Sequence, residues 1–199
     1  MNTNIDILFF GDSLTFGYGV KKQDSWVYKI TQEIFSTSLN KACNGYTTAY
    51  MLSRYYTDVL KYSPSNIFLM CGTNDLLLGR SIKSIIENIE LIIKDSLDIN
   101  SKLIIGIPPT IIGEMANKLF TPSSLYEYAE KELIMLKDEL ISLCNNYNLK
   151  FINFYDLTLN KKNLYLDGIH LSSIGHELMY KKALPYFKSI ANSWLKEMM

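Results

Sequence analysis

Short runs of apolar residues alternate along the chain with longer segments whose apolar residues recur every three or four positions. Three runs, at residues 7–10, 67–71 and 103–107, predict buried strands, because a parallel strand covered on both faces reads as a continuous apolar stretch. Two further strands are expected at residues 39–43, which are short and polar, and at residues 150–153. The pattern therefore predicts five strands.

The segments between these runs have the apolar spacing of helices. We expect helices at residues 24–35, 47–60, 81–97 and 123–147, and a closing helix that starts at Ser172 or Ser173. Pro185 lies inside the closing helix, and we expect it to kink or split that helix.

Regular alternation of strands and helices is typical of a doubly wound α/β domain, with a parallel sheet and helices on both faces. A chain of 199 residues is long enough for one such domain, spanning residues 1–199. Residues 108–122 are expected to form a long loop after the fourth strand. Its Met115, Leu119 and Phe120 could line a substrate pocket or simply pack over the sheet edge.

Composition narrows the classes of partner and compartment. Twenty basic and twenty acidic residues balance to a formal charge of zero, and without a basic stripe a nucleic acid is not expected as a partner. No apolar run has the length of a membrane span, and Asp6 interrupts the apolar N-terminal segment, so that no signal peptide is visible. These features favour a cytoplasmic protein.

The cysteines give no sign of a metal site or of disulfides. Cys43, Cys71 and Cys144 are scattered, there is no Cys-x-x-Cys pair, and the chain has two histidines. We interpret all three cysteines as buried small hydrophobic residues in a reducing compartment, and we expect neither a metal nor a cofactor.

Four polar clusters follow the predicted strands: Gly11-Asp12-Ser13, Asn44-Gly45, Gly72-Thr73-Asn74-Asp75 and Asp167-Gly168-Ile169-His170. Because the carboxyl ends of parallel strands meet at one edge of a sheet, these clusters are expected to converge on a single ligand crevice.

The residue types in these clusters match the needs of acyl transfer, which requires a nucleophile, a base, a group that orients the base, and donors for an oxyanion. Ser13 can be the nucleophile and His170 the base, with Asp167 three residues before it as the orienting carboxylate. The backbone N–H groups of Ser13 and Gly45 and the side-chain amide of Asn74 can stabilise the oxyanion.

Each of these residues also has a structural interpretation. Ser13 could cap a helix, Asn74 could serve in a turn, and Asp167 with Gly168 could form a turn of its own. Three other polar residues are expected to be structural rather than catalytic: Asp12, Asp75 and His176.

Taken together, the four clusters resemble, in order, the sequence blocks of the GDSL lipase/esterase family, also called SGNH hydrolases. The second block departs from the common Ser-Gly-Asp-Thr form, since this chain has Asn44-Gly45-Tyr46-Thr47. The resemblance implies a flavodoxin-like three-layer α/β/α fold and a metal-free serine hydrolase. It implies a Ser13–His170–Asp167 triad and an oxyanion hole formed by Ser13, Gly45 and Asn74.

The expected function is therefore that of a serine esterase acting on a small-molecule carboxylic ester, with short-chain acyl or acetyl esters favoured. An acyltransferase, a thioesterase or a lysophospholipase would use the same residues. A flavodoxin-like binding module without catalytic activity is the alternative from a different class, although the chain contains neither Gly-x-Gly-x-x-Gly nor a P-loop.

Overall fold

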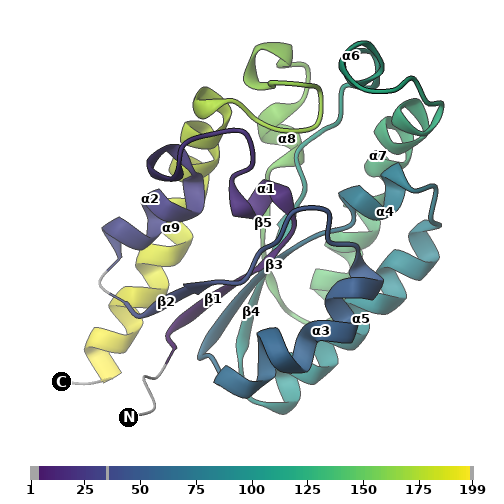
Figure 1. The fold of residues 1–199 in the computed structure, drawn as a ribbon. Coiled ribbons are helices and arrows are strands. Elements are labelled where there is room, and N and C mark those ends of the chain that lie inside the picture. Colours follow the sequence, from purple (N-terminus) through teal and green to yellow (C-terminus); the bar gives the residue numbers. More distant parts are fainter. Residues whose placement is uncertain (1–4, 35, 198–199) are drawn as a thin grey trace.

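Five strands form one parallel sheet in the order β2-β1-β3-β4-β5 (Figure 1). The architecture comes from a computed structural model that describes residues 5–34 and 36–197. The strands are β1 (Ile7–Gly11), β2 (Ser38–Asn40), β3 (Asn66–Met70), β4 (Lys102–Ile107) and β5 (Lys150–Asn153). The predicted α/β class and its five-stranded parallel sheet are confirmed.

The described helices are α1 (Ser13–Phe16), α2 (Trp26–Glu33), α3 (Thr48–Asp58), α4 (Thr73–Leu77), α5 (Ile82–Asp98), α6 (Gly113–Leu119), α7 (Leu125–Asn146), α8 (Tyr155–Thr158) and α9 (Ser173–Glu197). Helices α2 and α9 cover one face of the sheet, and α3, α5 and α7 cover the other (Figure 1). The result is a three-layer α/β/α arrangement.

Alternate residues of the central strands pack into two separate cores, one on each face of the sheet. Leu8 and Phe10 of β1 pack on the α3–α5–α7 side, whereas Ile7 and Phe9 pack on the α2–α9 side. All four side chains are fully buried, as expected for a strand that is covered on both faces. The continuous apolar run is therefore explained by two cores rather than by one.

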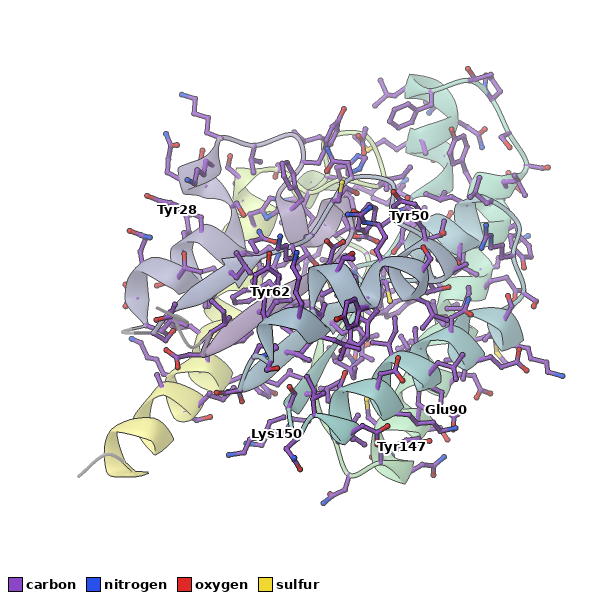
Figure 2. The ribbon with its side chains drawn as sticks, turned by 60° about the horizontal axis from the view of Figure 1, so that its bottom comes forward. Tyr28, Tyr50, Tyr62, Glu90, Tyr147 and Lys150 are labelled. Atoms are coloured by element: carbon purple, nitrogen blue, oxygen red, sulfur yellow. The ribbon has the colours of Figure 1, made fainter. Side chains whose placement is uncertain are left out.

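Specific contacts supplement the apolar core on each face. On the α2–α9 side, the rings of Phe9, Trp26, Phe68 and Phe187 form one aromatic cluster, with neighbouring centroids 5.1–6.0 Å apart. On the other side, Tyr147 after α7 donates a 2.6 Å hydrogen bond to Glu90 of α5, and both residues are labelled in Figure 2. The aromatic cluster packs α2 and α9 on the sheet, and the Tyr147–Glu90 bond joins α7 to α5.

The register of β1 and β3 determines where the polar clusters lie. Gly11 pairs with Met70, so the residues that follow these two strands leave the sheet side by side. The backbone N–H of Cys43 donates a 3.0 Å hydrogen bond to the Gly11 carbonyl. The segment after β2 therefore runs beside the exit of β1.

Four expectations about the elements are corrected. The predicted loop 108–122 contains α6, and the predicted strand 39–43 ends at Asn40. Helix α2 spans Trp26–Glu33 rather than 24–35, and Phe35 lies outside the described residues. Helix α9 is not split at Pro185, which lies on the exposed side of the helix, where water can hydrate the carbonyl that loses its N–H partner.

The interpretation of Cys43 was also wrong. Cys71 and Cys144 are buried, but Cys43 is exposed. Because β2 ends at Asn40, Cys43 belongs to the surface turn after the strand and not to the sheet.

Candidate active site

The turn that carries Ser13 is held by close packing and by a cap. The Asp12 carboxylate oxygen Oδ1 accepts a 2.9 Å hydrogen bond from the Leu14 backbone N–H, which makes Asp12 the N-cap of α1. A Cβ at Gly11 would lie 2.7 Å from the Met70 carbonyl oxygen, so only glycine fits there. Ser13 is the first residue of α1, where a backbone N–H has no acceptor within the helix.

Two buried residues, Trp26 and His176, stabilise this turn through hydrogen bonds. The Trp26 indole Nε1–H donates a 2.9 Å hydrogen bond to the Leu14 carbonyl. The Trp26 backbone N–H lies 3.5 Å from Nδ1 of His176, which accepts its hydrogen bond. Burial lowers the pKa of His176 to about 4, so this histidine is neutral and structural, as expected from its place on the last helix.

The segment that carries Asp167 and His170 is a tight loop. A β-bridge between Tyr165 and Leu171 closes its base, and the Leu166 backbone N–H donates a 2.8 Å hydrogen bond to the His170 carbonyl. The loop turns at Gly168, whose φ is +91°. This turn brings the side chains of Asp167 and His170 next to each other.

Three predicted site residues form a hydrogen-bonded chain. His170 Nε2 lies 3.1 Å from Ser13 Oγ, and His170 Nδ1 lies 2.7 Å from Asp167 Oδ2. The other oxygen of Asp167 accepts hydrogen bonds from the backbone N–H groups of Ile169 (2.9 Å) and His170 (2.7 Å). The imidazole is therefore held between a hydroxyl and a carboxylate.

Asp167 is ionised in this arrangement. Burial raises the pKa of its carboxyl, but the hydrogen bonds from the His170 side chain and from two backbone N–H groups outweigh burial and leave the pKa below its ordinary value. An ionised Asp167 fixes the proton of the neutral imidazole on Nδ1, which leaves Nε2 free to accept a proton from Ser13.

The Asn74 side chain lies at the start of α4, after the neighbouring strand. Its amide Nδ2–H donates a 2.9 Å hydrogen bond to the Tyr46 carbonyl. This contact joins α4 to the turn at residues 43–46, in which Gly45 has a φ of +77° and is exposed. The second and third predicted polar clusters are thereby linked to each other.

The buried carboxylate of Asp75 joins α4 to the start of α3. Asp75 accepts a 2.8 Å hydrogen bond from the Thr48 backbone N–H and a 2.7 Å bond from the Thr48 hydroxyl. Burial raises the pKa of Asp75, and the two bonds from Thr48 oppose that effect. Asp75 therefore has the structural role that its sequence context indicated, tying the start of α3 to α4.

One aromatic residue at the site was not singled out in the sequence. The ring of Tyr18 packs on the His170 imidazole with a centroid distance of 4.4 Å, and Tyr18 is 47% exposed. Its position between Gly17 and Gly19, just after the serine turn, is the only local signal, and that signal does not by itself indicate a contact with a histidine 152 residues later in the chain.

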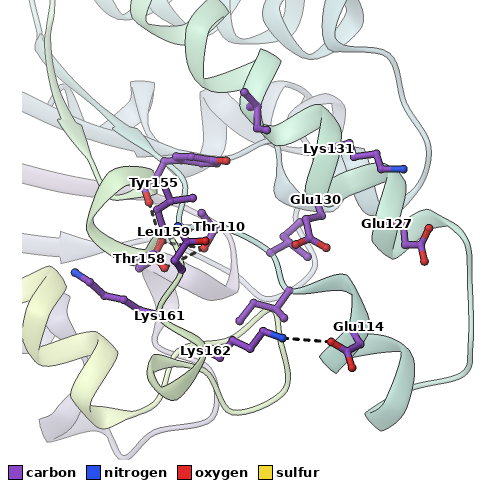
Figure 3. Close-up of a pocket in the computed structure, with 14 residues that line it drawn as sticks. Thr110, Glu114, Glu127, Glu130, Lys131, Tyr155, Thr158, Leu159, Lys161 and Lys162 are labelled. Carbon is purple, nitrogen blue, oxygen red and sulfur yellow. Dashed lines mark hydrogen bonds and ion pairs between the residues drawn. The ribbon is translucent and has the colours of Figure 1, made fainter.

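A cavity of about 520 Å³ lies between α6, α7 and α8 (Figure 3). Glu127, Glu130 and Lys131 of α7 face it from one side, and Tyr155 and Thr158 face it from α8. Its lining contains none of the five predicted site residues. Met115, Leu119 and Phe120 are not part of this lining either, and Met115 packs against the α2–α9 core.

Within residues 5–34 and 36–197, no group of three His, Cys, Asp or Glu side chains is placed to hold a metal ion. In the same part of the chain, no helix combines the length and apolar character that crossing a membrane requires.

Comparisons with known proteins agree with this architecture. The family model described as the GDSL-like Lipase/Acylhydrolase family matches residues 9–178. No curated protein matches the chain significantly in sequence.

Several solved structures have the same fold. A member of the lipolytic G-D-S-L family from Veillonella parvula is 25% identical, with 92% of this chain and 98% of that chain covered and a TM-score of 0.77. A lipase/acylhydrolase from Enterococcus faecalis is 24% identical, with 93% and 96% covered and a TM-score of 0.76. An acetylxylan esterase from Geobacillus stearothermophilus is 16% identical, with 94% and 96% covered and a TM-score of 0.73.

Proposed function

Because the chain belongs to the GDSL-like lipase/acylhydrolase family, we propose that it is a serine esterase that cleaves short-chain acyl esters through Ser13, His170 and Asp167. One observation carries the proposal: Ser13 Oγ, the His170 imidazole and the Asp167 carboxylate follow one another at 3.1 and 2.7 Å. These are the contacts that a serine nucleophile, its base and the orienting carboxylate require.

The reaction proceeds in two steps. In the first step, Ser13 Oγ attacks the ester carbonyl carbon, His170 Nε2 takes the hydroxyl proton, and the same proton then passes to the leaving alcohol. In the second step, water attacks the acyl–Ser13 ester, again with His170 as the base, and the carboxylic acid leaves. Asp167 stabilises the imidazolium that forms in both steps.

The oxyanion that develops at each step is assigned to three donors. Ser13 supplies its backbone N–H from the start of α1, and Gly45 supplies its own from the neighbouring turn. Asn74 supplies an amide hydrogen, since an NH₂ group has two and the Tyr46 carbonyl takes only one. The Tyr46 contact also fixes which way the amide points.

A short acyl group is favoured over a long chain. Ser13 is only 6% exposed, and Tyr18 packs over His170 beside it, so the space at the nucleophile is restricted. The acetylxylan esterase among the structural neighbours removes acetyl groups according to its name, which is consistent with a small acyl group here.

The test is a panel of p-nitrophenyl esters from acetate to octanoate, with Ser13→Ala as the inactive variant and Ser142→Ala, at an exposed position on α7, as the matched control. We expect kcat/KM to fall as the acyl chain lengthens, and Ser13→Ala to abolish turnover and labelling by a fluorophosphonate probe. Near-wild-type turnover by Ser13→Ala would refute the mechanism, and a preference for octanoate would refute the substrate class.

The same panel distinguishes the alternatives. An added acceptor alcohol that captures most of the acyl group would indicate an acyltransferase. A wild-type protein that neither turns over any ester nor reacts with the probe would indicate a binding module.

A further inference from the structure

The backbone ties Tyr18 to the residue that carries the proposed nucleophile. The Ser13 carbonyl accepts hydrogen bonds from the backbone N–H groups of Gly17 (2.9 Å) and Tyr18 (3.1 Å), at the end of α1. Gly17 has a φ of +91°, and a Cβ there would lie 2.6 Å from the Ser25 side chain, so both conformation and space favour glycine. The turn that presents Ser13 therefore also fixes where Tyr18 begins.

The Tyr18 ring contacts the proposed base and is still partly open to solvent. Its centroid lies 4.4 Å from that of the His170 imidazole, with an angle of 46° between the two planes. The side chains of Asp167 and His170 are each 16% exposed, whereas Tyr18 is 47% exposed. Tyr18 thus packs on the imidazole and keeps nearly half of its surface available to a further partner.

A second apolar side chain adjoins Tyr18. A Cβ at Gly19 would lie 2.6 Å from Leu166 Cδ1, so the Leu166 side chain packs on the backbone next to Tyr18. Leu166 is 43% exposed, and its backbone N–H donates a 2.8 Å hydrogen bond to the His170 carbonyl. Tyr18 and Leu166 together form a partly exposed apolar edge beside His170, which we call the Tyr18–Leu166 edge.

The first step of the proposed reaction brings the leaving alcohol to this side of the site. His170 Nε2 gives its proton to the alcohol oxygen as the ester bond breaks, so that oxygen lies about 3 Å from Nε2. The carbonyl oxygen of the ester is directed instead to the proposed donors, which include Gly45 and Asn74. The carbon atoms that follow the alcohol oxygen are therefore the part of the substrate nearest to the Tyr18 ring.

We propose that Tyr18 is a specificity-determining residue that binds the alcohol part of the substrate and favours alcohols with a ring close to the ester oxygen. A flat ring packs well on the open part of a tyrosine, and Leu166 adds apolar surface beside it. This inference rests on the proposed function, because it concerns the alcohol that the first step releases.

The experiment compares benzyl, cyclohexylmethyl and ethyl acetate, which all form the same acetyl–Ser13 intermediate. Each releases a primary alcohol, and differences in intrinsic reactivity cancel when a variant is compared with the wild type on one ester. We expect Tyr18→Ala to lower kcat/KM about tenfold for the two ring esters, because the ring contact is lost, and less than about twofold for ethyl acetate.

Two further variants control for the substitution. Tyr18→Phe keeps the ring and should behave as the wild type on all three esters. Tyr56→Ala removes a tyrosine of α3 that is 70% exposed, and should also leave the three values unchanged. Thermal denaturation checks that each variant folds, and Tyr18→Leu replaces Tyr18→Ala if the alanine variant does not.

Breakdown of acetyl–Ser13 distinguishes alcohol binding from a merely structural role of Tyr18. The alcohol has already left at this stage, so the breakdown rate should be the same in Tyr18→Ala and the wild type. The steady-state phase after a burst of p-nitrophenol from p-nitrophenyl acetate gives this rate. Equal losses of kcat/KM on all three esters with slower breakdown would mean that Tyr18 only orients His170, and would overturn the proposal. Unchanged kcat/KM for the ring esters would overturn it as well.

Binding without turnover separates this proposal from the proposed function. Calorimetric titration of Ser13→Ala with benzyl acetate gives a Kd, which we expect to be about tenfold higher in the double variant Ser13→Ala/Tyr18→Ala. Equal Kd values would overturn the role of Tyr18. A wild-type protein that reacts with neither ester nor fluorophosphonate probe would instead overturn the proposed function, and the two Kd values would still decide whether Tyr18 binds the ring.

Discussion

Asn74, which we propose as an oxyanion donor, has its side chain oriented by a neighbouring residue. One amide hydrogen is bonded to the Tyr46 carbonyl at 2.9 Å, and this bond leaves the other hydrogen with a defined direction. A donor that is fixed before the substrate arrives needs no reorganisation when negative charge develops. The strength of the proposed oxyanion hole thus depends on a backbone carbonyl 28 residues away in sequence.

Replacing Asn74 by alanine should therefore impair the reaction far more than the fold. Removal of one oxyanion donor typically costs about 2.7–4 kcal/mol of transition-state stabilisation, so we expect kcat to fall about 10²- to 10³-fold. Steady-state kinetics on p-nitrophenyl acetate, with thermal denaturation as the control for folding, test this expectation. A kcat within threefold of the wild type would contradict the role of Asn74 as an oxyanion donor.

Local sequence was informative for residues whose chemistry is specific and uninformative for residues whose role depends on a distant contact. Ser13, Asp167 and His170 could be singled out because few residue types perform acyl transfer, and the structure brings their side chains into one hydrogen-bonded chain. Tyr18 could not be singled out, since its contact with His170 exists only after the two ends of the chain have met. The exposure of Cys43 was missed because it depends on where a three-residue edge strand ends.

Among the elements, α6 and the Asp167–His170 loop depend on each other. The Ile112 backbone N–H donates a 2.8 Å hydrogen bond to the Gly168 carbonyl. A Cβ at Gly168 would lie 2.5 Å from the Ile112 carbonyl oxygen and 2.8 Å from the Ala116 nitrogen. The start of α6 therefore sits directly on the turn that separates Asp167 from His170.

Gly168→Ala and Gly45→Ala form a matched pair that tests this packing. Both glycines have positive φ, at +91° and +77°, but nothing lies within 4 Å of a Cβ at Gly45. We expect Gly45→Ala to lower the free energy of unfolding by about 1 kcal/mol, from backbone strain alone. Gly168→Ala should cost about 2–4 kcal/mol, because steric overlap with α6 adds to the strain.

Urea denaturation of the two variants measures the difference. Equal losses of unfolding free energy would mean that α6 can move away from Gly168, and that the turn does not depend on it.

The elements that sequence predicted well are those with a long or uninterrupted pattern. Four of the five strands and the helices α5 and α7 were expected within one or two residues of their observed bounds. Three of these strands are continuous apolar runs, and the two helices repeat their apolar positions with one period. Helix α6 was missed because seven residues are too few to form a stable helix without tertiary support, which here includes the contacts with Gly168 and with Glu130 of α7. Pro185 was expected to kink or split α9, and it does not split the helix, since the proline is exposed and water can hydrate the carbonyl that lacks an N–H partner.

At the scale of the whole molecule, the candidate site lies at one edge of a sheet that has a separate apolar core on each face. The core beneath α2 and α9 contains the aromatic cluster of Phe9, Trp26, Phe68 and Phe187, and Trp26 also bonds to the serine turn. Helix α9 thus supports both ends of the site, since it begins three residues after His170 and packs against the aromatic rings below Ser13.

Phe187→Ala should consequently destabilise the fold without changing the chemistry. Phe187 is fully buried, and removing such a ring typically costs about 3–5 kcal/mol of unfolding free energy. Phe120→Ala, at a phenylalanine that is 42% exposed, should change the unfolding free energy by about 0.5 kcal/mol or less. Chemical denaturation gives both values, and kcat measured where the variants remain folded should match the wild type. A loss below 1 kcal/mol for Phe187→Ala would contradict the assignment of this core.

The 157 residues between Ser13 and His170 have a consequence for the life of the protein in the cell. At about 5–20 residues per second, a ribosome adds His170 about 8–30 s after Ser13. During that interval the nascent chain has the proposed nucleophile but not the proposed base. The proposed esterase therefore gains its hydrolytic capacity only after the segment that carries His170 has been synthesised and has folded beside the turn that carries Ser13.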